Sequence, residues 1–400
     1  MKILQVNVVC GVGSTGRIAT DLYKVLEQEG HECLIAYGRG SAPSGINAYR
    51  IGSDLDMYLH VAKTRFFDKT AFGSKRGTEE FIKNIEKFNP DIIHLHNIHG
   101  YYLNIEILFD YLKRTNKPVV WTLHDCWSFT GHCSHFDYVG CEKWKYGCYD
   151  CIQKNEYPNS LLVDNSKWNY EKKKKIFTSL ENLTIVTPSK WLASLVKQSF
   201  LAKYEVRVIS NSIDLTVFKA VNTEDIEVKL KLQNKFVIFG AATTWDKKKG
   251  LNDFIELSKK IDDETRIVLV GLSDSQIQGL PSNILGLKRT DSVEELVQLY
   301  SRADVFINTS VEETFGLVTV EAMACGTPVI VYNATAAPEL VPKNCGFIAK
   351  INDVDEVYNC IMQIKNKGKA YYSENCVNEV HSKYSNEDKY NEYINLYKEK

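Results

Sequence analysis

The sequence lacks long apolar runs: no stretch approaches the roughly 18 to 20 consecutive apolar residues that a membrane-spanning helix needs. Its first residues, Met1–Val9, are too short an apolar run and too β-like for a secretory signal peptide. The chain also has little excess of either charge, because 49 Lys and Arg residues are balanced by 50 Asp and Glu residues. We therefore expect a cytoplasmic protein that does not span the membrane and has no nucleic-acid partner.

Cysteine, by contrast, is plentiful. The chain has 11 cysteines, and without a secretory signal we expect them to be reduced rather than paired. Four of them lie close together in the sequence: Cys133, Cys141, Cys148 and Cys151. Four thiols that end in a Cys-x2-Cys pair match the ligand number of a tetrahedral structural zinc site, for which His132 and His135 are competing ligands. Free thiols and redox-dependent disulfides remain the alternatives.

Short runs of β-branched residues alternate with helical patterns, which predicts an α/β fold with parallel sheets. Strands are expected at Ile3–Val9, Glu32–Tyr37, Asp91–His96, Pro118–Leu123, Leu183–Thr187, Glu205–Ile209, Phe236–Gly240, Arg266–Gly271, Val305–Thr309, Pro328–Tyr332 and Gly346–Ala349. Helices are expected at Arg17–Glu29, Glu79–Phe88, Asn104–Arg114, Asn165–Ser179, Lys190–Ser199, Leu251–Ile261, Val293–Arg302, Gly316–Cys325, Val354–Lys367 and Ser385–Tyr397. Because 400 residues are too many for one core, we expect two Rossmann-like domains, residues 1–210 and 211–384, followed by a last helix in 385–400.

A glycine-rich loop follows the first expected strand. Gly11, Gly13 and Gly16 form a G-x-G-x-x-G pattern at the start of a helix, which is typical of dinucleotide-binding proteins. That pattern also needs an acidic residue about 20 residues further on, at the end of the second strand, to bind the ribose. The chain has Arg39 in that region and no acid. The loop therefore leaves an NADP-dependent oxidoreductase as an alternative function, with Arg39 beside the 2′-phosphate.

The most informative segment is Glu313–Glu321, whose two terminal glutamates are separated by seven residues at the expected start of a helix. The amides at a helix N-terminus, together with its positive dipole end, suit phosphate oxygens. Gly316 lets a ligand approach the backbone closely. A carboxylate such as that of Glu321 can accept hydrogen bonds from both hydroxyl groups of a ribose. The segment thus predicts a nucleotide-binding helix.

This segment resembles the E-x7-E signature of retaining GT-B glycosyltransferases of glycosyltransferase family 4, of the bacterial exopolysaccharide or colanic-acid type. The resemblance implies two Rossmann-like domains that face each other across a cleft, with the helix of residues 385–400 crossing back to the first domain. It also implies transfer of a sugar, with retention, from a nucleotide-diphosphate donor to a glycan acceptor that is expected to be lipid-linked. A two-lobed protein that binds a nucleotide sugar without catalysis is a second alternative.

The resemblance also assigns residues to the donor site. Lys249 matches the Lys of the family's Lys-Gly pair, but Thr244 stands where an Arg usually accompanies it. Lys247 or Lys248 is therefore expected to supply the second positive charge, and Glu313 is expected to be catalytic. The expected donor-binding residues are Gly13, Thr244, Lys248, Lys249, Thr314, Phe315, Gly316, Leu317 and Glu321. Because lysines and helix amides neutralise the leaving diphosphate, no catalytic metal is expected.

On the acceptor side, Trp121–Gly131 resembles the T-x-H-D…T-G string of bacterial exopolysaccharide glycosyltransferases. His124 and Asp125 are expected to be catalytic, with His124 in contact with the transferred sugar or the acceptor. Both follow an expected strand, and α/β proteins bind ligands at the carboxyl ends of parallel strands. His99, at another strand end, is a further functional candidate, whereas His94 is expected to be a hydrogen-bonded core residue.

The segment Lys167–Phe177 mixes aromatic residues with lysines on an expected helix. Such a pattern is usually a solvated helix face. The alternative is a basic, aromatic surface that contacts anionic lipid, which suits an enzyme with a lipid-linked acceptor. This alternative predicts peripheral contact with the inner face of the membrane.

Overall fold

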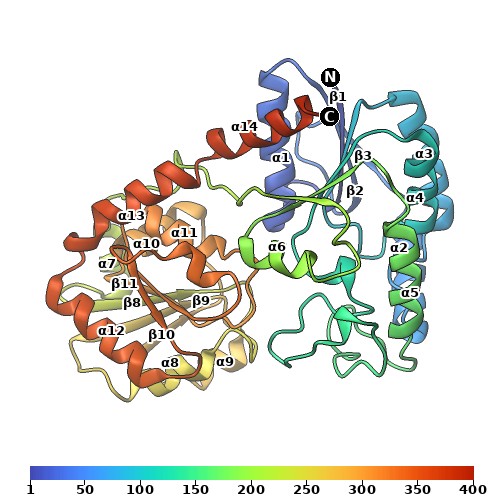
Figure 1. Ribbon diagram of the computed structural model, residues 1–400. Helices are drawn as coiled ribbons and strands as arrows, with labels where there is room; N and C mark the ends of the chain where they lie inside the picture. Colours follow the sequence, from blue (N-terminus) through green and yellow to red (C-terminus); the bar gives the residue numbers. More distant parts are fainter. The chain divides into compact units, whose positions relative to one another are not determined.

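The computed structural model describes all 400 residues, Met1–Lys400, and divides them into two compact units. Unit 1 consists of Met1–Ser210 and Tyr390–Lys400, and unit 2 consists of Asn211–Lys389 (Figure 1). Each unit contains one parallel sheet with helices packed on it. The predicted fold class, α/β with two parallel sheets, is therefore confirmed.

The sheet of unit 1 has seven parallel strands in the order β3-β2-β1-β4-β5-β6-β7. The strands are β1 (Lys2–Val9), β2 (Glu32–Arg39), β3 (Ala48–Arg50), β4 (Ile92–Leu95), β5 (Val119–Thr122), β6 (Leu183–Thr187) and β7 (Glu205–Val208). Chain order runs outward from β1 to β3 on one side and from β4 to β7 on the other. The sheet therefore has a switch point between β1 and β4, and α/β proteins bind ligands beside the strand ends at such a point.

Helices cover both faces of this sheet. The α-helices of unit 1 are α1 (Gly13–Gln28), α2 (Asp54–Phe67), α3 (Lys75–Phe88), α4 (Ile105–Thr115), α5 (Ser166–Phe177), α6 (Lys190–Val196) and, from Tyr390 on, α14 (Asn386–Lys398). α1 and α14 lie side by side on one face (Figure 1), and their buried residues share a hydrophobic core with the strands. α3, α4, α5 and α6 contribute to a second core. Because alternate residues of a strand point to opposite faces, Ile3 belongs to the first core and Leu4 to the second.

The last helix supplies hydroxyl groups to the buried strands of unit 1. Tyr397 Oη lies 2.6 Å from His94 Nδ1, and Tyr393 Oη lies 3.1 Å from Thr122 Oγ1. Thr122 Oγ1 in turn lies 2.7 Å from His94 Nε2. His94 is fully buried with both ring nitrogens hydrogen-bonded, so it is a core residue that ties α14 to the sheet.

The sheet of unit 2 has six parallel strands in the order β10-β9-β8-β11-β12-β13. The strands are β8 (Phe236–Ala241), β9 (Thr265–Val270), β10 (Ile284–Leu287), β11 (Val305–Asn308), β12 (Val329–Tyr332) and β13 (Gly346–Ala349). The helices of unit 2 are α7 (Glu224–Leu230), α8 (Leu251–Ser258), α9 (Asp274–Gln278), α10 (Val293–Arg302), α11 (Leu317–Ala324), η3 (Ala337–Leu340), α12 (Val354–Lys367) and α13 (Ala370–Lys383). The switch point of this sheet lies between β8 and β11.

The sequence patterns do not predict α2, α13 or the strands β3 and β10, nor the short helices α7 and α9. β3 has three half-buried residues, and α13 buries only Tyr372, Cys376 and Val380. Such a narrow buried stripe gives weak periodicity in a sequence. Between β5 and α5 the only helical elements are the short 3-10 helices η1 (Trp127–Phe129) and η2 (Lys143–Lys145). None of the helices combines the length and the apolar character needed to cross a bilayer.

Candidate functional site

In unit 2, the loops that follow β8 and β11 bring charged residues together. Lys249 Nζ lies 2.6 Å from Glu313 Oε1 and 3.2 Å from Ser310 Oγ. The Lys249 side chain keeps 32% of its surface exposed, and the Glu313 side chain keeps 16%. The ion pair is thus accessible at the switch point of the sheet, and Glu313 holds the ammonium group of Lys249 in place.

A second ion pair lies next to the first in the chain. Lys248 Nζ lies 2.8 Å from Glu312 Oε2. The backbones of the two loops are also joined, because the Val311 amide donates to the Lys248 carbonyl at 3.0 Å. Gly250 follows with a φ of 73°, and a Cβ there would lie 2.5 Å from Thr309 Oγ1. Glycine is therefore required both by the backbone conformation and by the close approach of the loops.

The helix that carries the second glutamate starts just after the Lys249–Glu313 pair. α11 follows Gly316, whose φ of 104° lies in the region that favours glycine. The first amides of the helix have no acceptors within it and form the positive end of the helix dipole. Phe315 and Gly316 are buried, while Thr314 and Leu317 are half-buried. This helix start offers backbone amides to an anion.

Glu321 lies one turn into α11 and is 5% exposed. Its Oε2 accepts a hydrogen bond of 2.9 Å from the hydroxyl group of Tyr300, a fully buried residue of α10. Tyr300 therefore orients the carboxylate. The sequence gives no signal for Tyr300 or Ser310, because each contacts its partner only through the packing of neighbouring elements, which no local pattern records.

Thr244, expected at the donor site, lies in the loop between β8 and α8 and is exposed. The next residue, Trp245, is buried and its indole N–H donates to the Val270 carbonyl at 2.9 Å, which anchors the loop. The structure therefore pairs Lys248 with Glu312 and Lys249 with Glu313. It leaves Thr244 exposed on the surface of the loop.

In unit 1, the glycine-rich loop leads into α1. Gly13 is the first residue of α1, has a φ of 64°, and a Cβ there would meet no atom within 4 Å. Gly16 is buried in the first turn, and its carbonyl accepts from the Gly11 amide at 3.1 Å. Gly13 is thus an open position at a helix start, where an anionic or polar ligand can approach the backbone.

Histidines and an aspartate gather at the ends of β4 and β5. His96 Nδ1 lies 3.1 Å from His124 Nε2, and the two rings stack with centroids 5.4 Å apart. Asp125 Oδ2 lies 2.8 Å from His99 Nε2, and Asp125 Oδ1 accepts from the Trp127 amide at 2.9 Å. Because both of its oxygens are engaged, Asp125 orients His99 and the loop that follows β5. His124 is half-buried beside it.

Burial and neighbouring groups together determine the charge of these side chains. It lowers the pKa of His124 to about 4 and the pKa of His96 well below its ordinary value. Burial also opposes ionisation of Asp125, but neighbouring His99 outweighs that effect and the pKa of the carboxyl falls to about 2. At neutral pH His96 and His124 are therefore uncharged, each with one N–H donor and one acceptor nitrogen, while Asp125 is ionised.

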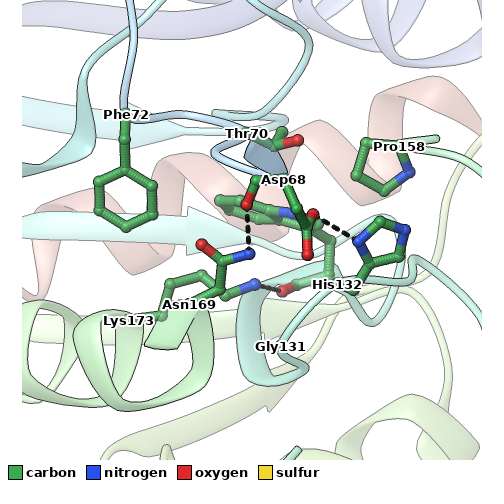
Figure 2. Close-up of a pocket in the computed structure, with 9 residues that line it drawn as sticks. Asp68, Thr70, Phe72, Gly131, His132, Pro158, Asn169 and Lys173 are labelled. Atoms are coloured by element: carbon green, nitrogen blue, oxygen red, sulfur yellow. Dashed lines mark hydrogen bonds and ion pairs between the residues drawn. The ribbon is translucent and has the colours of Figure 1, made fainter. Parts of the chain in front are cut away.

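A buried polar cluster anchors the long loop between β5 and α5 (Figure 2). Asp68 Oδ1, at the end of α2, lies 2.6 Å from His132 Nδ1, and the Asp68 carbonyl accepts from Asn169 Nδ2 at 2.7 Å. Lys173 Nζ donates to the Trp127 carbonyl at 2.5 Å and lies over the Trp127 ring. Burial lowers the pKa of Lys173 to about 7. α2 and α5 together hold the loop that follows the predicted catalytic residues.

The same packing changes the interpretation of the basic, aromatic segment. α5 buries Tyr170, Lys173 and Phe177, so these residues do not face solvent or lipid. Trp168 is partly exposed, with Lys69 Nζ 4.9 Å from its ring. The segment Lys167–Phe177 is therefore divided. Tyr170, Lys173 and Phe177 pack into the interior of unit 1, whereas Lys167, Trp168, Lys174 and Lys175 are exposed.

The four clustered cysteines line one small pocket in the long loop, together with His132 and Trp144. The Gly131 amide donates to Cys148 Sγ at 3.1 Å. A hydrogen bond with Cys133 lowers the pKa of the Cys151 thiol to about 7. No three His, Cys, Asp or Glu side chains in the chain are arranged as a ready-made set of metal ligands. The four cysteines lie close together as free thiols, and zinc binding stays a prediction.

The two parallel α/β sheets have the fold of the GT-B class. The structure resembles sucrose-phosphate synthase from Thermosynechococcus elongatus with a TM-score of 0.73 and 19% identity, covering 100% of this chain and 98% of that chain. It resembles HepE from Anabaena in complex with UDP with a TM-score of 0.71 and 16% identity, covering 100% of both chains. At these identities the likeness establishes the fold.

Sequence comparison establishes the family. Residues 15–217 match Glycosyltransferase Family 4, and residues 233–366 match Glycosyl transferases group 1. The chain belongs to glycosyltransferase family 4, and the protein is a glycosyltransferase. The putative colanic acid biosynthesis glycosyl transferase WcaC of Escherichia coli strain K12 is 25% identical over 361 residues, 86% of each chain. The family resemblance is thus confirmed, which removes the oxidoreductase interpretation of the Gly11–Gly16 loop.

Proposed function

We propose that the protein transfers a sugar from a nucleotide-diphosphate donor to a glycan acceptor with retention of the anomeric configuration. The observation that carries this proposal is the Lys249–Glu313 ion pair just before the start of α11, with Glu321 one turn into the helix. The diphosphate suits Lys249 and the helix amides, the ribose suits Glu321, and the sugar hydroxyls suit Glu313. HepE structures with UDP and with UDP-glucose support a donor of this kind.

The proposed reaction depends on charge stabilisation rather than on a protein nucleophile. As the bond between sugar and diphosphate breaks, negative charge develops on the leaving phosphate and positive charge on the sugar. In this proposal, Lys249 and the first amides of α11 stabilise the phosphate, while the Glu313 carboxylate faces the sugar. The departing phosphate takes the proton of the attacking hydroxyl group on the same face of the sugar, which retains its configuration. No metal ion is needed for this neutralisation.

The configuration of the product tests the proposal. The full chain is incubated with a panel of nucleotide-diphosphate sugars and an oligosaccharide acceptor, and the anomer formed is identified by NMR. We expect an α-linked donor to give an α-linked product, at a rate that EDTA in the assay does not change. An inverted product would refute retention, and activity lost on brief chelation and restored by Mn²⁺ would refute metal-free transfer. Donor binding without transfer would favour the non-catalytic alternative.

We further propose that the acceptor is a lipid-linked glycan of a surface polysaccharide and that the enzyme works at the cytoplasmic face of the membrane. The names of two relatives support this substrate class. WcaC is named for colanic acid biosynthesis, and O-antigen chain mannosyltransferase B of Escherichia coli is 44% identical over 70 residues, 18% of this chain and 18% of the relative.

Unit 1 has an exposed apolar surface that suits such membrane contact. Its members, here called the α2 surface, are Leu55, Tyr58, Leu59, Phe66, Phe67, Leu161, Leu162 and Val163. Those on α2 follow helical spacing and form a stripe along the helix. The Leu161 amide donates to the Arg65 carbonyl at 2.7 Å, which places the loop members beside the end of α2. Lys63, Arg65 and Lys69 at that end provide positive charge for anionic lipid headgroups.

Replacing Leu59 and Phe66 together by Glu is expected to weaken binding to phosphatidylglycerol vesicles at least tenfold. Burying each apolar side chain in lipid contributes about 1.5–3 kcal/mol, and the new carboxylates repel the anionic surface. Cosedimentation with vesicles measures the effect. Val228→Glu is the matched control, because Val228 is 68% exposed on α7 of unit 2 and Leu59 is 62% exposed on α2. Equal binding by the double variant and the wild type would disprove the role of the α2 surface.

We also propose that the four clustered cysteines hold a structural zinc ion. They line one pocket, and the Gly131 amide already donates to Cys148 Sγ, as amides do to metal-bound thiolates. Purified protein is then expected to contain about one equivalent of zinc, and Cys148→Ser is expected to lower the Tm by about 5 °C or more before it affects kcat. Cys360→Ser, at a buried cysteine of unit 2, is the control. Metal-free protein with four titratable thiols and an unchanged Tm in Cys148→Ser would leave the cysteines as packing residues.

A further inference from the structure

A chain of hydrogen bonds joins His124 to the buried interior of unit 1. Gln5 lies on β1, and His96 and His124 follow β4 and β5, so the three residues come from three adjacent strands. His124 Nε2 lies 3.1 Å from His96 Nδ1, and His96 Nε2 lies 3.1 Å from Gln5 Oε1. Gln5 Nε2 donates to the Ala19 carbonyl in α1 at 3.0 Å. This chain of hydrogen bonds therefore ends on the Ala19 carbonyl oxygen, which can only accept a hydrogen bond.

The direction of every hydrogen bond follows from that end. A carbonyl oxygen only accepts, so the Gln5 amide must turn its nitrogen to Ala19 and its oxygen to His96. The Gln5 oxygen also only accepts, so His96 carries its proton on Nε2. Burial keeps His96 neutral by lowering its pKa, which leaves Nδ1 as an acceptor. His124 must then donate through Nε2, and because it is neutral as well its Nδ1 is unprotonated.

We propose that Gln5 and His96 are positioning residues that hold His124 in the Nε2–H tautomer, so that Nδ1 is the hydrogen-bond acceptor it presents to a sugar hydroxyl group. Gln5 is 0% exposed and His96 is 1% exposed, so they act on the reaction only through His124. An acceptor nitrogen binds a hydroxyl proton and repels a phosphate oxygen. The inference deepens the proposed function, because it rests on the role of His124 on the acceptor side.

Nitrogen NMR of the substrate-free full chain, labelled with ¹⁵N-histidine, reads the tautomer directly. We expect His124 to show a protonated Nε2 and an unprotonated Nδ1, with its signals assigned by their loss in His124→Ala. Gln5→Met removes the amide oxygen at similar side-chain length, so His96 loses its fixed acceptor. In that variant we expect the Nδ1–H tautomer of His124 to appear and kcat to fall about tenfold at unchanged donor KM, the loss expected for one hydrogen bond.

The hydrogen-bonded chain from Gln5 through His96 to His124 is here called the relay. Two further variants distinguish the loss of this relay from general loosening of the core. Gln5→Glu restores an oxygen that accepts from His96 and, when protonated, donates to Ala19, so it is expected to recover the wild-type tautomer and most of kcat. Tyr23→Phe removes a buried hydroxyl group from the same helix, α1, outside the relay, and is expected to change neither readout.

The proposal fails if His124 carries its proton on Nδ1 in the wild type, a result that needs no variant to fold. It also fails if Gln5→Met keeps both the wild-type tautomer and the wild-type kcat. The underlying role of His124 is tested separately by the turnover of His124→Ala: full activity there removes His124 from the reaction, whereas the tautomer in substrate-free protein reports on the relay alone.

Discussion

Replacing Glu313 by Ala is expected to lower kcat by about 10- to 150-fold while the affinity for UDP stays the same or rises slightly. The loss corresponds to about 1.5–3 kcal/mol for a charge-assisted hydrogen bond to the sugar. The affinity for UDP is spared because Glu313 Oε1 lies 2.6 Å from Lys249 Nζ, so removal of the carboxylate releases that ammonium group to the diphosphate. Initial rates at saturating donor give kcat, and calorimetric titration with UDP gives Kd.

Glu313→Gln is the matched variant for this experiment. It keeps the shape and an acceptor oxygen but loses the charge, so its kcat is expected to lie between those of the wild type and Glu313→Ala. If Glu313→Ala lost UDP affinity as strongly as turnover, the assignment of Glu313 to the sugar would be wrong. Glu313 would then serve the diphosphate site by holding Lys249.

Replacing Glu321 by Ala is expected to weaken UDP binding by about 10- to 150-fold, which corresponds to about 1.5–3 kcal/mol for the lost charge-assisted hydrogen bonds to the ribose. The carboxylate is 5% exposed and Tyr300 orients it, so it is preorganised for a ligand. Calorimetric titration of both proteins with UDP measures the change, and kcat/KM for the donor is expected to fall by a similar factor.

Two controls separate ribose recognition from damage to the fold. Tyr300→Phe removes the hydroxyl group that donates to Glu321 Oε2 and keeps the carboxylate, so most of the UDP affinity is expected to remain. A 2′,3′-dideoxy analogue of UDP is expected to bind the wild type weakly and to lose nothing further with Glu321→Ala. Independent, additive losses from the analogue and the variant would place the ribose elsewhere.

The sequence was sufficient for the fold class and for the segments that reach the candidate site. The strands with continuous β-branched runs, such as β1, β6 and β12, lie where their patterns predict them. The helix expected at Gly316–Cys325 is observed as Leu317–Ala324, because a glycine before an apolar run and a Gly-Thr-Pro after it mark both ends. These signals are local, since each depends on residues within one or two turns of chain.

Other elements gave no usable signal. α2 exposes an apolar stripe and buries His60 and Thr64, the reverse of the usual amphipathic pattern, so periodicity does not identify its buried face. The composition of the lysine-rich segment of α5 predicts a surface, yet Lys173 is buried on Trp127. Composition reports the average preference of a residue, whereas burial depends on the particular partner that the fold supplies.

The sequence by itself determined that the chain has two α/β domains and belongs to the glycosyltransferase family. It also determined where glycines precede the helices and where Glu313 and Glu321 lie around the start of α11. Only the tertiary structure decided which side chains pair: Glu321 with Tyr300, Lys249 with Glu313, and His124 with Gln5 through His96. The physical reason is the sheet order. The periodicity of a helix or strand is set within a few residues of the chain. By contrast, β1 becomes the neighbour of β4, and β4 of β5, only when the sheet forms. That adjacency places Gln5 and His96, which are 91 residues apart, in one hydrogen-bonded chain.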